Sequence, residues 1–235
     1  MHAARRTAGD RTRFAMPETG IGLFPDVGGT YFLPRLPGET GMWLALTGVR
    51  LGPVDTLKSG IADHYMPSDR FGELIDALAG LEIGPREPIE AVDWAIEALA
   101  RQPEGPSVLE EHRERIDRLF AGPNVEGILG ALDGARHYWA EEQRAEILKK
   151  SPTCTRIAFR QVREGAGLSF EDCMRLEYRL VRFCMAQPDF YEGVRAALID
   201  RDQSPKWDPP TLAGADEAHV APAFLPLGPG EELHL

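Results

Sequence analysis

The sequence is poor in cysteine and in basic residues, and it has no long hydrophobic run. Its three cysteines in 235 residues, Cys154, Cys173 and Cys184, are an odd number without the spacing of a metal site. This usage indicates core thiols in a reducing compartment, and we expect a cytoplasmic protein. Lys and Arg number 26 against 37 Asp and Glu, a net charge of -11. Because nucleic acids are bound mainly through Lys and Arg on phosphates, a nucleic-acid partner is disfavoured.

Membrane association is also not expected. Uninterrupted apolar runs stay well short of the roughly 18 residues that span a bilayer. The basic start, Met1 to Arg6, leads into polar residues instead of the apolar segment of a secretory signal. With 43% hydrophobic and 27% charged residues, the chain has the composition of a soluble globular protein with a sizeable core.

Helical patterns cover most of the chain, and the expected strands are few, short and near the N-terminus. Strands are predicted at residues 13–16, before Pro17, and at residues 61–66. The helices predicted in this region cover residues 30–36, about 39–46 (before Gly48), and 53–60, where Pro53 suits a first helical turn.

Four segments follow from these patterns. Residues 1–66 hold the strands and an acidic loop, and residues 67–150 predict a helical insertion. Residues 151–208 predict the C-terminal helices, and the Pro- and Gly-rich tail, 209–235, is expected to be poorly ordered or draped over the surface. The insertion is expected to break at Gly84-Pro85, Pro103 to Pro106 and Gly122-Pro123.

Several polar residues are better explained by structure than by chemistry. Ser151 before Pro152, Ser169 and Asp189 have the pattern of helix N-caps, which argues against either serine as a nucleophile. His112 lies on the apolar stripe of an amphipathic helix and is expected to be packed in the core.

The candidate catalytic residues are Glu18 and Asp26, eight positions apart in a loop of apolar residues, Gly and Pro. An acidic side chain in apolar surroundings loses hydration, so its pKa rises and it becomes a useful base or acid near neutral pH. The structural alternatives are a turn-stabilising role for Glu18 and a helix N-cap for Asp26. Gly28 and Gly29 permit close packing, and their N–H groups are placed to support negative charge.

The stretch Arg13-Phe-Ala-Met-Pro-Glu-Thr-Gly-Ile-Gly-Leu-Phe-Pro-Asp-Val-Gly-Gly-Thr-Tyr-Phe-Leu-Pro-Arg-Leu36 resembles the central motif of the enoyl-CoA hydratase/isomerase (crotonase) superfamily. Further matches are Leu44-Ala-Leu-Thr-Gly48, Ser59-Gly-Ile-Ala-Asp63, Ser151-Pro-Thr153 and the run from Asp189 to Trp207. Hydratases of this superfamily usually carry glycine where Asp26 stands. The aspartate, with the Asp-Gln-Ser-Pro-Lys-Trp ending, resembles the 3-hydroxyisobutyryl-CoA hydrolase branch.

This resemblance implies an α/β crotonase-like fold, truncated and mostly α-helical here, with residues 1–66 as the C-terminal part of the core. It implies hydrolysis of a short branched 3-hydroxyacyl-CoA thioester, as formed in valine breakdown. Glu18 would attack as nucleophile or activate water as general base, and Asp26 would bind the substrate hydroxyl. The resemblance implies no cofactor and no metal, because coenzyme A is part of the substrate.

In the family, the glycine-rich oxyanion segments and much of the sheet precede the motif, whereas only 12 residues precede Arg13. We therefore expect this chain alone to be an inefficient hydrolase, and its exposed core faces predict a homo-oligomer. Three explanations stay open: a start codon assigned too late, an inactive truncated protein for binding or oligomerisation, or complementation by another polypeptide. Enoyl-CoA hydration or isomerisation is the alternative activity.

Overall fold

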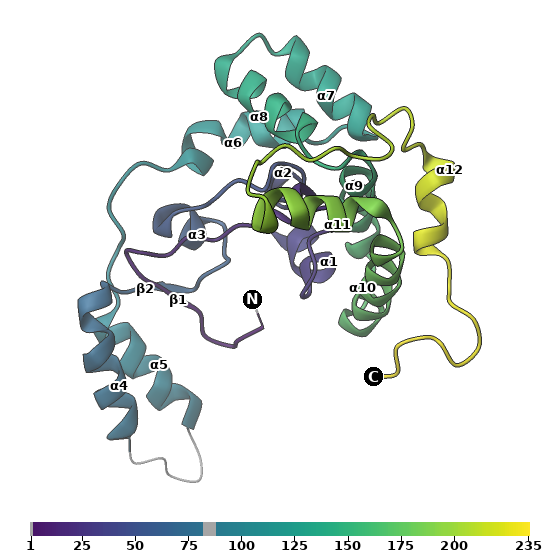
Figure 1. Ribbon diagram of the computed structural model, residues 1–235. Helices are drawn as coiled ribbons and strands as arrows, with labels where there is room; N and C mark the ends of the chain where they lie inside the picture. The colour runs from purple at the N-terminus through teal and green to yellow at the C-terminus, as the bar shows by residue number, and fades with distance from the viewer. Residues whose placement is uncertain (1, 82–87) are drawn as a thin grey trace. The chain divides into compact units, whose positions relative to one another are not determined.

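Helices make up most of the computed structural model, which describes residues 2–81 and 88–235 (Figure 1). The strands are β1 (Thr7–Ala8) and β2 (His64–Tyr65). The helices are α1 (Gly29–Phe32), α2 (Thr40–Thr47), α3 (Pro53–Lys58), α4 (Phe71–Ala79), α5 (Pro88–Leu99), α6 (Val108–Leu119), α7 (Val125–Gly134), α8 (Tyr138–Leu148), α9 (Pro152–Gly165), α10 (Phe170–Met185), α11 (Pro188–Val194) and α12 (Glu217–Val220). The predicted predominance of helix is confirmed. None of the helices within the described ranges is both long and apolar enough to cross a membrane.

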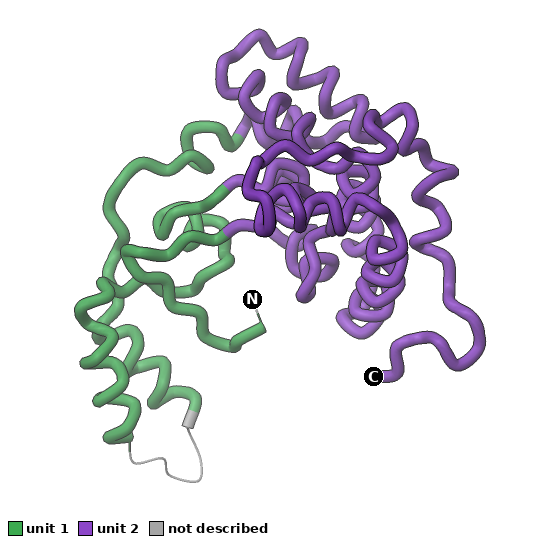
Figure 2. Tube along the Cα trace, viewed as in Figure 1, with its two compact units in different colours: residues 1–14, 50–113 green, residues 15–49, 114–235 purple. Residues whose placement is uncertain are grey.

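Contacts within the chain divide it into two compact units (Figure 2). Unit 1 comprises residues 1–14 and 50–113, and unit 2 comprises residues 15–49 and 114–235. The predicted segment boundaries after residues 66 and 150 fall inside these units. The four-segment division therefore stays a prediction.

In unit 1, β1 and β2 form a parallel pair, with Thr7 opposite His64 and Ala8 opposite Tyr65. This pair confirms the strand predicted within residues 61–66. The strand predicted at residues 13–16 is wrong, because only Phe14 pairs, in an isolated antiparallel bridge with Leu51. Leu51 is followed by Gly52 and then by α3, so the chain after Leu51 does not continue as a strand that could pair with residues 13–16.

The helices in the first 60 residues begin and end close to the proline and glycine residues that predicted their boundaries. Helix α2 ends at Thr47 with Gly48 in the left-handed conformation, and α3 starts at Pro53. The predicted helix at residues 30–36 forms as α1 followed by a 3-10 turn over Leu33–Arg35.

The predicted breaks in the insertion are also confirmed where the structure describes them. Residues 103–106 and 122–123 are not helical, whereas Gly84-Pro85 lies outside the described residues. His112 is buried in α6, as its place on the apolar stripe indicates.

The core of unit 2 is built on α9 and α10. Its buried cluster consists of Phe24, Cys154, Ile157, Leu176, Leu180, Cys184, Val220, Ala223 and Phe224. All three cysteines are free and buried, so the prediction of core thiols is confirmed. The expectation for the tail is wrong for residues 217–224: α12 and the 3-10 turn Ala221–Phe224 pack on α9 and α10, because three apolar residues among the prolines join this core.

Two of the three predicted helix caps are confirmed. Ser151 Oγ accepts a hydrogen bond from the Cys154 N–H at 3.0 Å, and Ser169 Oγ accepts one from the Asp172 N–H at 3.1 Å. Asp189 is not a cap, because Pro188 occupies the first helical position and Gln187 precedes it as the cap residue. Instead the buried Asp189 carboxylate accepts the Ser151 hydroxyl at 2.5 Å and the Asp208 N–H at 2.7 Å.

Helix α11 lies directly against the turn that follows Pro17. A Cβ atom at Gly193 would stand 2.3 Å from the Ile21 carbonyl carbon, and one at Gly22 would stand 2.3 Å from the Asp189 carbonyl carbon. Such distances are far inside van der Waals contact, and both neighbours are backbone that cannot rotate away. The two glycines therefore allow α11 to support the turn.

Replacing Gly193 with alanine is expected to destabilise the protein by about 3 kcal/mol, the upper part of the usual cost of overpacking. The matched control is Gly130→Ala in α7, where an added Cβ meets nothing within 4 Å. There the substitution is expected to stabilise by about 0.5–1 kcal/mol, because alanine favours helix. Urea unfolding of both variants measures the difference. Equal effects would show that α11 does not lie this close to the turn.

Candidate active site

Glu18 begins a 3-10 turn, Glu18–Ile21, that is fixed by backbone contacts. The Glu18 carbonyl accepts the N–H groups of Gly22 and Leu23, and Gly22 has the left-handed φ of 72° that such a turn requires. The Ser151 N–H, at the start of α9, donates to the Thr19 carbonyl at 3.0 Å. The turn is thus attached to α9 on one side and packed on α11 on the other.

The Glu18 carboxyl group is largely buried. Its Oε2 atom has no hydrogen-bond partner among residues 2–81 and 88–235. Burial raises the pKa of Glu18 to about 7; the backbone N–H of Glu18 opposes this shift and the charge of Asp26 adds to it. A carboxyl group with this pKa is partly ionised at neutral pH and can both accept and return a proton. A turn-stabilising role does not account for the unpartnered oxygen.

Asp26 is half-buried in the loop that leads into α1. Burial raises the pKa of Asp26, and its own backbone N–H lowers it. The negative charge of Asp26 acts on Glu18, so the structure brings the two predicted residues into electrostatic contact. The N-cap alternative is wrong, because Gly28 occupies the cap position of α1 and no side-chain hydrogen bond within the described residues caps this helix.

A third carboxylate, Glu177 of α10, was missed in the sequence. Its Oε2 accepts the Gly28 N–H at 3.0 Å and its Oε1 accepts the Thr30 N–H at 2.9 Å. Burial raises the pKa of Glu177, the hydrogen bonds from Gly28 and Thr30 lower it, and the charge of Asp26 raises it. A signal was present, since Glu177 lies on the same helical face as the buried Cys173 and Leu180. A charged residue on an apolar stripe needs a buried partner.

Gln161 of α9 was missed in the same way. Its Nε2 donates to the Pro25 carbonyl at 2.5 Å and to Thr30 Oγ1 at 2.7 Å. Gln161 is fully buried between Ile157, Ala158 and Val162 on the inner face of the helix. The loop from Pro25 to Thr30 is therefore held from α9 as well as from α10.

These contacts decide which backbone N–H groups remain for a ligand. Those of Gly28 and Thr30 are bound by Glu177, and that of Gly29 donates to the Asp26 carbonyl at 2.9 Å. The Gly28 N–H does stabilise a negative charge, as predicted, but that charge is the Glu177 carboxylate. The start of α1 therefore does not offer these donors to a substrate oxyanion.

Lys150 lies beside the Glu18 turn, since its Nζ would be 3.7 Å from a Cβ atom at Gly20. Burial lowers the pKa of Lys150, the charge of Glu146 raises it and that of Lys149 lowers it. The residue also lines a cavity of about 330 Å³ with Pro152, Thr155 and the segment from Pro210 to Ala213. A partly desolvated ammonium group is thus available close to the turn.

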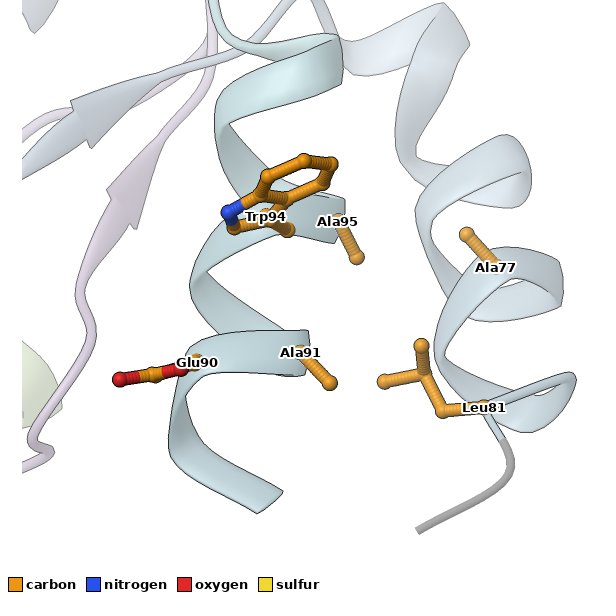
Figure 3. Close-up of a pocket in the computed structure, with 6 residues that line it drawn as sticks. All are labelled: Ala77, Leu81, Glu90, Ala91, Trp94 and Ala95. Atoms are coloured by element: carbon orange, nitrogen blue, oxygen red, sulfur yellow. The ribbon is translucent and has the colours of Figure 1, made fainter. Parts of the chain in front are cut away.

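A larger cavity, of about 600 Å³, lies in unit 1 between α4 and α5 (Figure 3). Its walls include Ala77, Leu81, Ala91 and Ala95, whose side chains face the space between the two helices, whereas Glu90 points away from it. Such a lining offers apolar contact and no set of groups for acid–base chemistry. The lining of this cavity therefore does not add a second candidate for acid–base chemistry to Glu18 and Asp26.

Comparison with known proteins identifies the family to which this chain is related. A model of the enoyl-CoA hydratase/isomerase family matches residues 1–224. Curated proteins named 3-hydroxyisobutyryl-CoA hydrolase, mitochondrial, from Danio rerio and Gallus gallus are each 46% identical to 97% of this chain, which covers 60% of their length. A crystal structure of a carnitinyl-CoA dehydratase from Mycobacterium thermoresistibile superposes with a TM-score of 0.86 at 39% identity, over 97% of this chain and 63% of that one.

The chain thus spans about 60% of the length of the curated relatives it matches. The family match and the superposition confirm the predicted crotonase-like fold class. This chain belongs to the enoyl-CoA hydratase/isomerase family.

Proposed function

We propose that this chain carries the acid–base pair of an acyl-CoA thioester hydrolase. The substrate is a short branched 3-hydroxyacyl thioester, 3-hydroxyisobutyryl-CoA, and the products are 3-hydroxyisobutyrate and coenzyme A, a step of valine catabolism. The observation that carries the proposal is the buried Glu18 with a pKa of about 7 next to the charge of Asp26. The names of the relatives at 46% identity support hydrolysis.

Two routes use Glu18, and both release coenzyme A. As general base, Glu18 takes a proton from water while the water oxygen bonds to the carbonyl carbon; the C–S bond then breaks and the thiolate recovers the proton. As nucleophile, the carboxylate itself bonds to the carbonyl carbon and expels the thiolate, and water then hydrolyses the mixed anhydride. The buried Oε2, which has no partner in the described part of the chain, suits either route.

Asp26 binds the substrate through its 3-hydroxyl group in this proposal. A carboxylate that accepts this hydroxyl would fix the acyl carbon relative to Glu18, and orientation of this kind contributes a large share of catalysis. The oxyanion of the tetrahedral intermediate needs backbone donors as well. The N–H groups of Gly28, Gly29 and Thr30 are already bound, so the start of α1 does not supply those donors.

Hydration or isomerisation of an enoyl-CoA is the second candidate, favoured by the superposition on a carnitinyl-CoA dehydratase. A binding or oligomerisation protein without activity is the third. Thiol release from 3-hydroxyisobutyryl-CoA, measured for this chain and for a version extended upstream in its gene, separates them. Hydration of an enoyl-CoA without thiol release would establish the second candidate. The third would be favoured if neither version showed activity and Glu18→Gln left every measured property, including partner binding, unchanged.

The remaining expectations belong to the same proposal. It requires no cofactor or metal, because coenzyme A enters with the substrate, and it includes self-association but no nucleic-acid partner. The cytoplasmic location stays a prediction; the relatives from Danio rerio and Gallus gallus are named as mitochondrial.

Glu18→Gln is expected to lower kcat for thiol release by about 10²- to 10⁴-fold, the usual contribution of a positioned base. The same substitution is expected to stabilise the fold at pH 8. The pKa of Glu18 is about 7 in the folded state, against 4.5 for an exposed glutamate. The folded state therefore holds the extra proton between these values, and stability falls as pH rises through them.

The increase in the free energy of unfolding caused by Glu18→Gln is therefore on the order of 1–3 kcal/mol at pH 8. It vanishes below the unfolded pKa of about 4.5. Urea unfolding at pH 8 and pH 4.5 measures it, with Glu171→Gln on the exposed face of α10 as the control. Loss of activity with equal destabilisation at both pH values would show a structural role for Glu18.

Asp26→Ala is expected to abolish the preference for the hydroxylated substrate. A hydrogen bond to a charged group is worth about 1.5–3 kcal/mol, so kcat/KM for 3-hydroxyisobutyryl-CoA falls by roughly 10- to 100-fold. For isobutyryl-CoA, which lacks the hydroxyl, the same variant changes kcat/KM much less. Parallel thiol-release assays give both values; equal losses on the two substrates would show that Asp26 does not bind the hydroxyl.

A further inference from the structure

Val27 has a backbone conformation that its side chain disfavours. Its φ is 47°, in the left-handed region, although valine is β-branched. Such a residue is a genuine outlier, which persists only when its surroundings impose it. The Val27 side chain is 68% exposed, so core packing does not impose the conformation. The backbone on either side of Val27 is held by contacts that restrict this conformation.

Those contacts come from two helices. On the N-terminal side, Gln161 holds the Pro25 carbonyl. On the C-terminal side, the two oxygens of Glu177 hold the N–H groups of Gly28 and Thr30. Glu177 therefore binds the residue directly after Val27, and its charge strengthens both hydrogen bonds.

Asp26 directly precedes Val27, so its direction depends on this conformation. If Val27 relaxed to a negative φ, the chain before it would rotate relative to α1, and Asp26 would turn with it. Glu177 cannot itself serve as the proposed base without giving up contacts, because it is buried and both of its oxygens accept backbone N–H groups. Its position is that of a support for the loop.

We propose that Glu177 is a positioning residue that keeps Val27 in the left-handed conformation and thereby directs Asp26 at the substrate hydroxyl. This inference rests on the proposed hydrolase function for its kinetic consequence. The structural part, the link from Glu177 through Val27 to Asp26, stands on the contacts alone.

The test is a rescue experiment. Glu177→Gln keeps the volume of the side chain but replaces one acceptor with an NH₂ group, so one of the two backbone N–H groups loses its partner. Val27→Asn puts a residue that tolerates the left-handed region at the strained position. If Glu177 acts through Val27, the double variant recovers the substrate preference that Glu177→Gln loses.

In the upstream-extended version, Glu177→Gln is expected to lower kcat/KM on 3-hydroxyisobutyryl-CoA at least tenfold and to reduce the preference over isobutyryl-CoA. The double variant Glu177→Gln/Val27→Asn is expected to recover most of that preference. Glu171→Gln on the same helix is the control for the substitution itself. A double variant that folds but keeps the substrate preference of Glu177→Gln would overturn the proposal.

A second readout needs no catalysis. In ¹⁵N and ¹³C NMR spectra of this chain, Glu177→Gln is expected to accelerate amide exchange at Gly28 or Thr30 and to shift the Asp26 carboxyl resonance. In the double variant the Asp26 resonance returns towards its original position while amide exchange stays fast. An Asp26 resonance that does not respond to Glu177→Gln would refute the link, whether or not the hydrolase function holds.

Discussion

The loop from Pro17 to Thr30 keeps the Glu18 carboxyl group largely, and the Asp26 carboxyl group partly, out of water, and the rest of unit 2 provides the support that this requires. An irregular loop lacks the regular backbone hydrogen bonds of a helix or sheet, so contacts with neighbouring helices hold its segments in place. The N–H of Ser151 at the start of α9 holds the Glu18 turn, Gly193 lets α11 pack against it, and Glu177 of α10 holds the start of α1. Without these contacts the Glu18 carboxyl group would be hydrated, and its pKa would not be raised by burial.

Burial of Glu18 makes the site costly to fold and chemically useful for the same reason. The unpartnered Oε2 loses hydration and gains no hydrogen bond within the described residues, which raises the pKa to about 7. The cost is offset by the apolar cluster of α9, α10 and the C-terminal segment. That segment matters for this reason: Val220, Ala223 and Phe224 complete the core behind the loop. A site that weakens the fold at neutral pH in this way is typical of functional residues.

Local patterns in the sequence predicted the parts of the structure that depend on local chemistry. The helix ending at Gly48, the caps Ser151 and Ser169, and the loop with Glu18 and Asp26 all follow from residues close together in the chain. Contacts between distant residues were not predictable in this way. Glu177 binds Gly28 across 149 positions, and only its place on an apolar stripe indicated that it needed a partner.

The incorrect predictions have the same origin. Asp189 has the sequence pattern of a helix cap, yet its carboxylate accepts a hydrogen bond from the hydroxyl of Ser151, 38 positions earlier in the chain. The segment at residues 13–16 has strand character but finds a partner only at Leu51. The apolar residues of the tail showed no periodicity, and their role in the core became visible only with the helices that they cover.

Catalysis by Glu18 near neutral pH depends on the fold raising the pKa of its carboxyl group. The most direct measurement is a ¹³C NMR titration of the Glu18 side-chain carboxyl in this chain, assigned by comparison with Glu18→Gln. The account predicts a midpoint at about pH 7. A midpoint near 4.5, the usual pKa of an exposed glutamate, would show that the carboxyl group is hydrated and would contradict a catalytic pKa shift by burial.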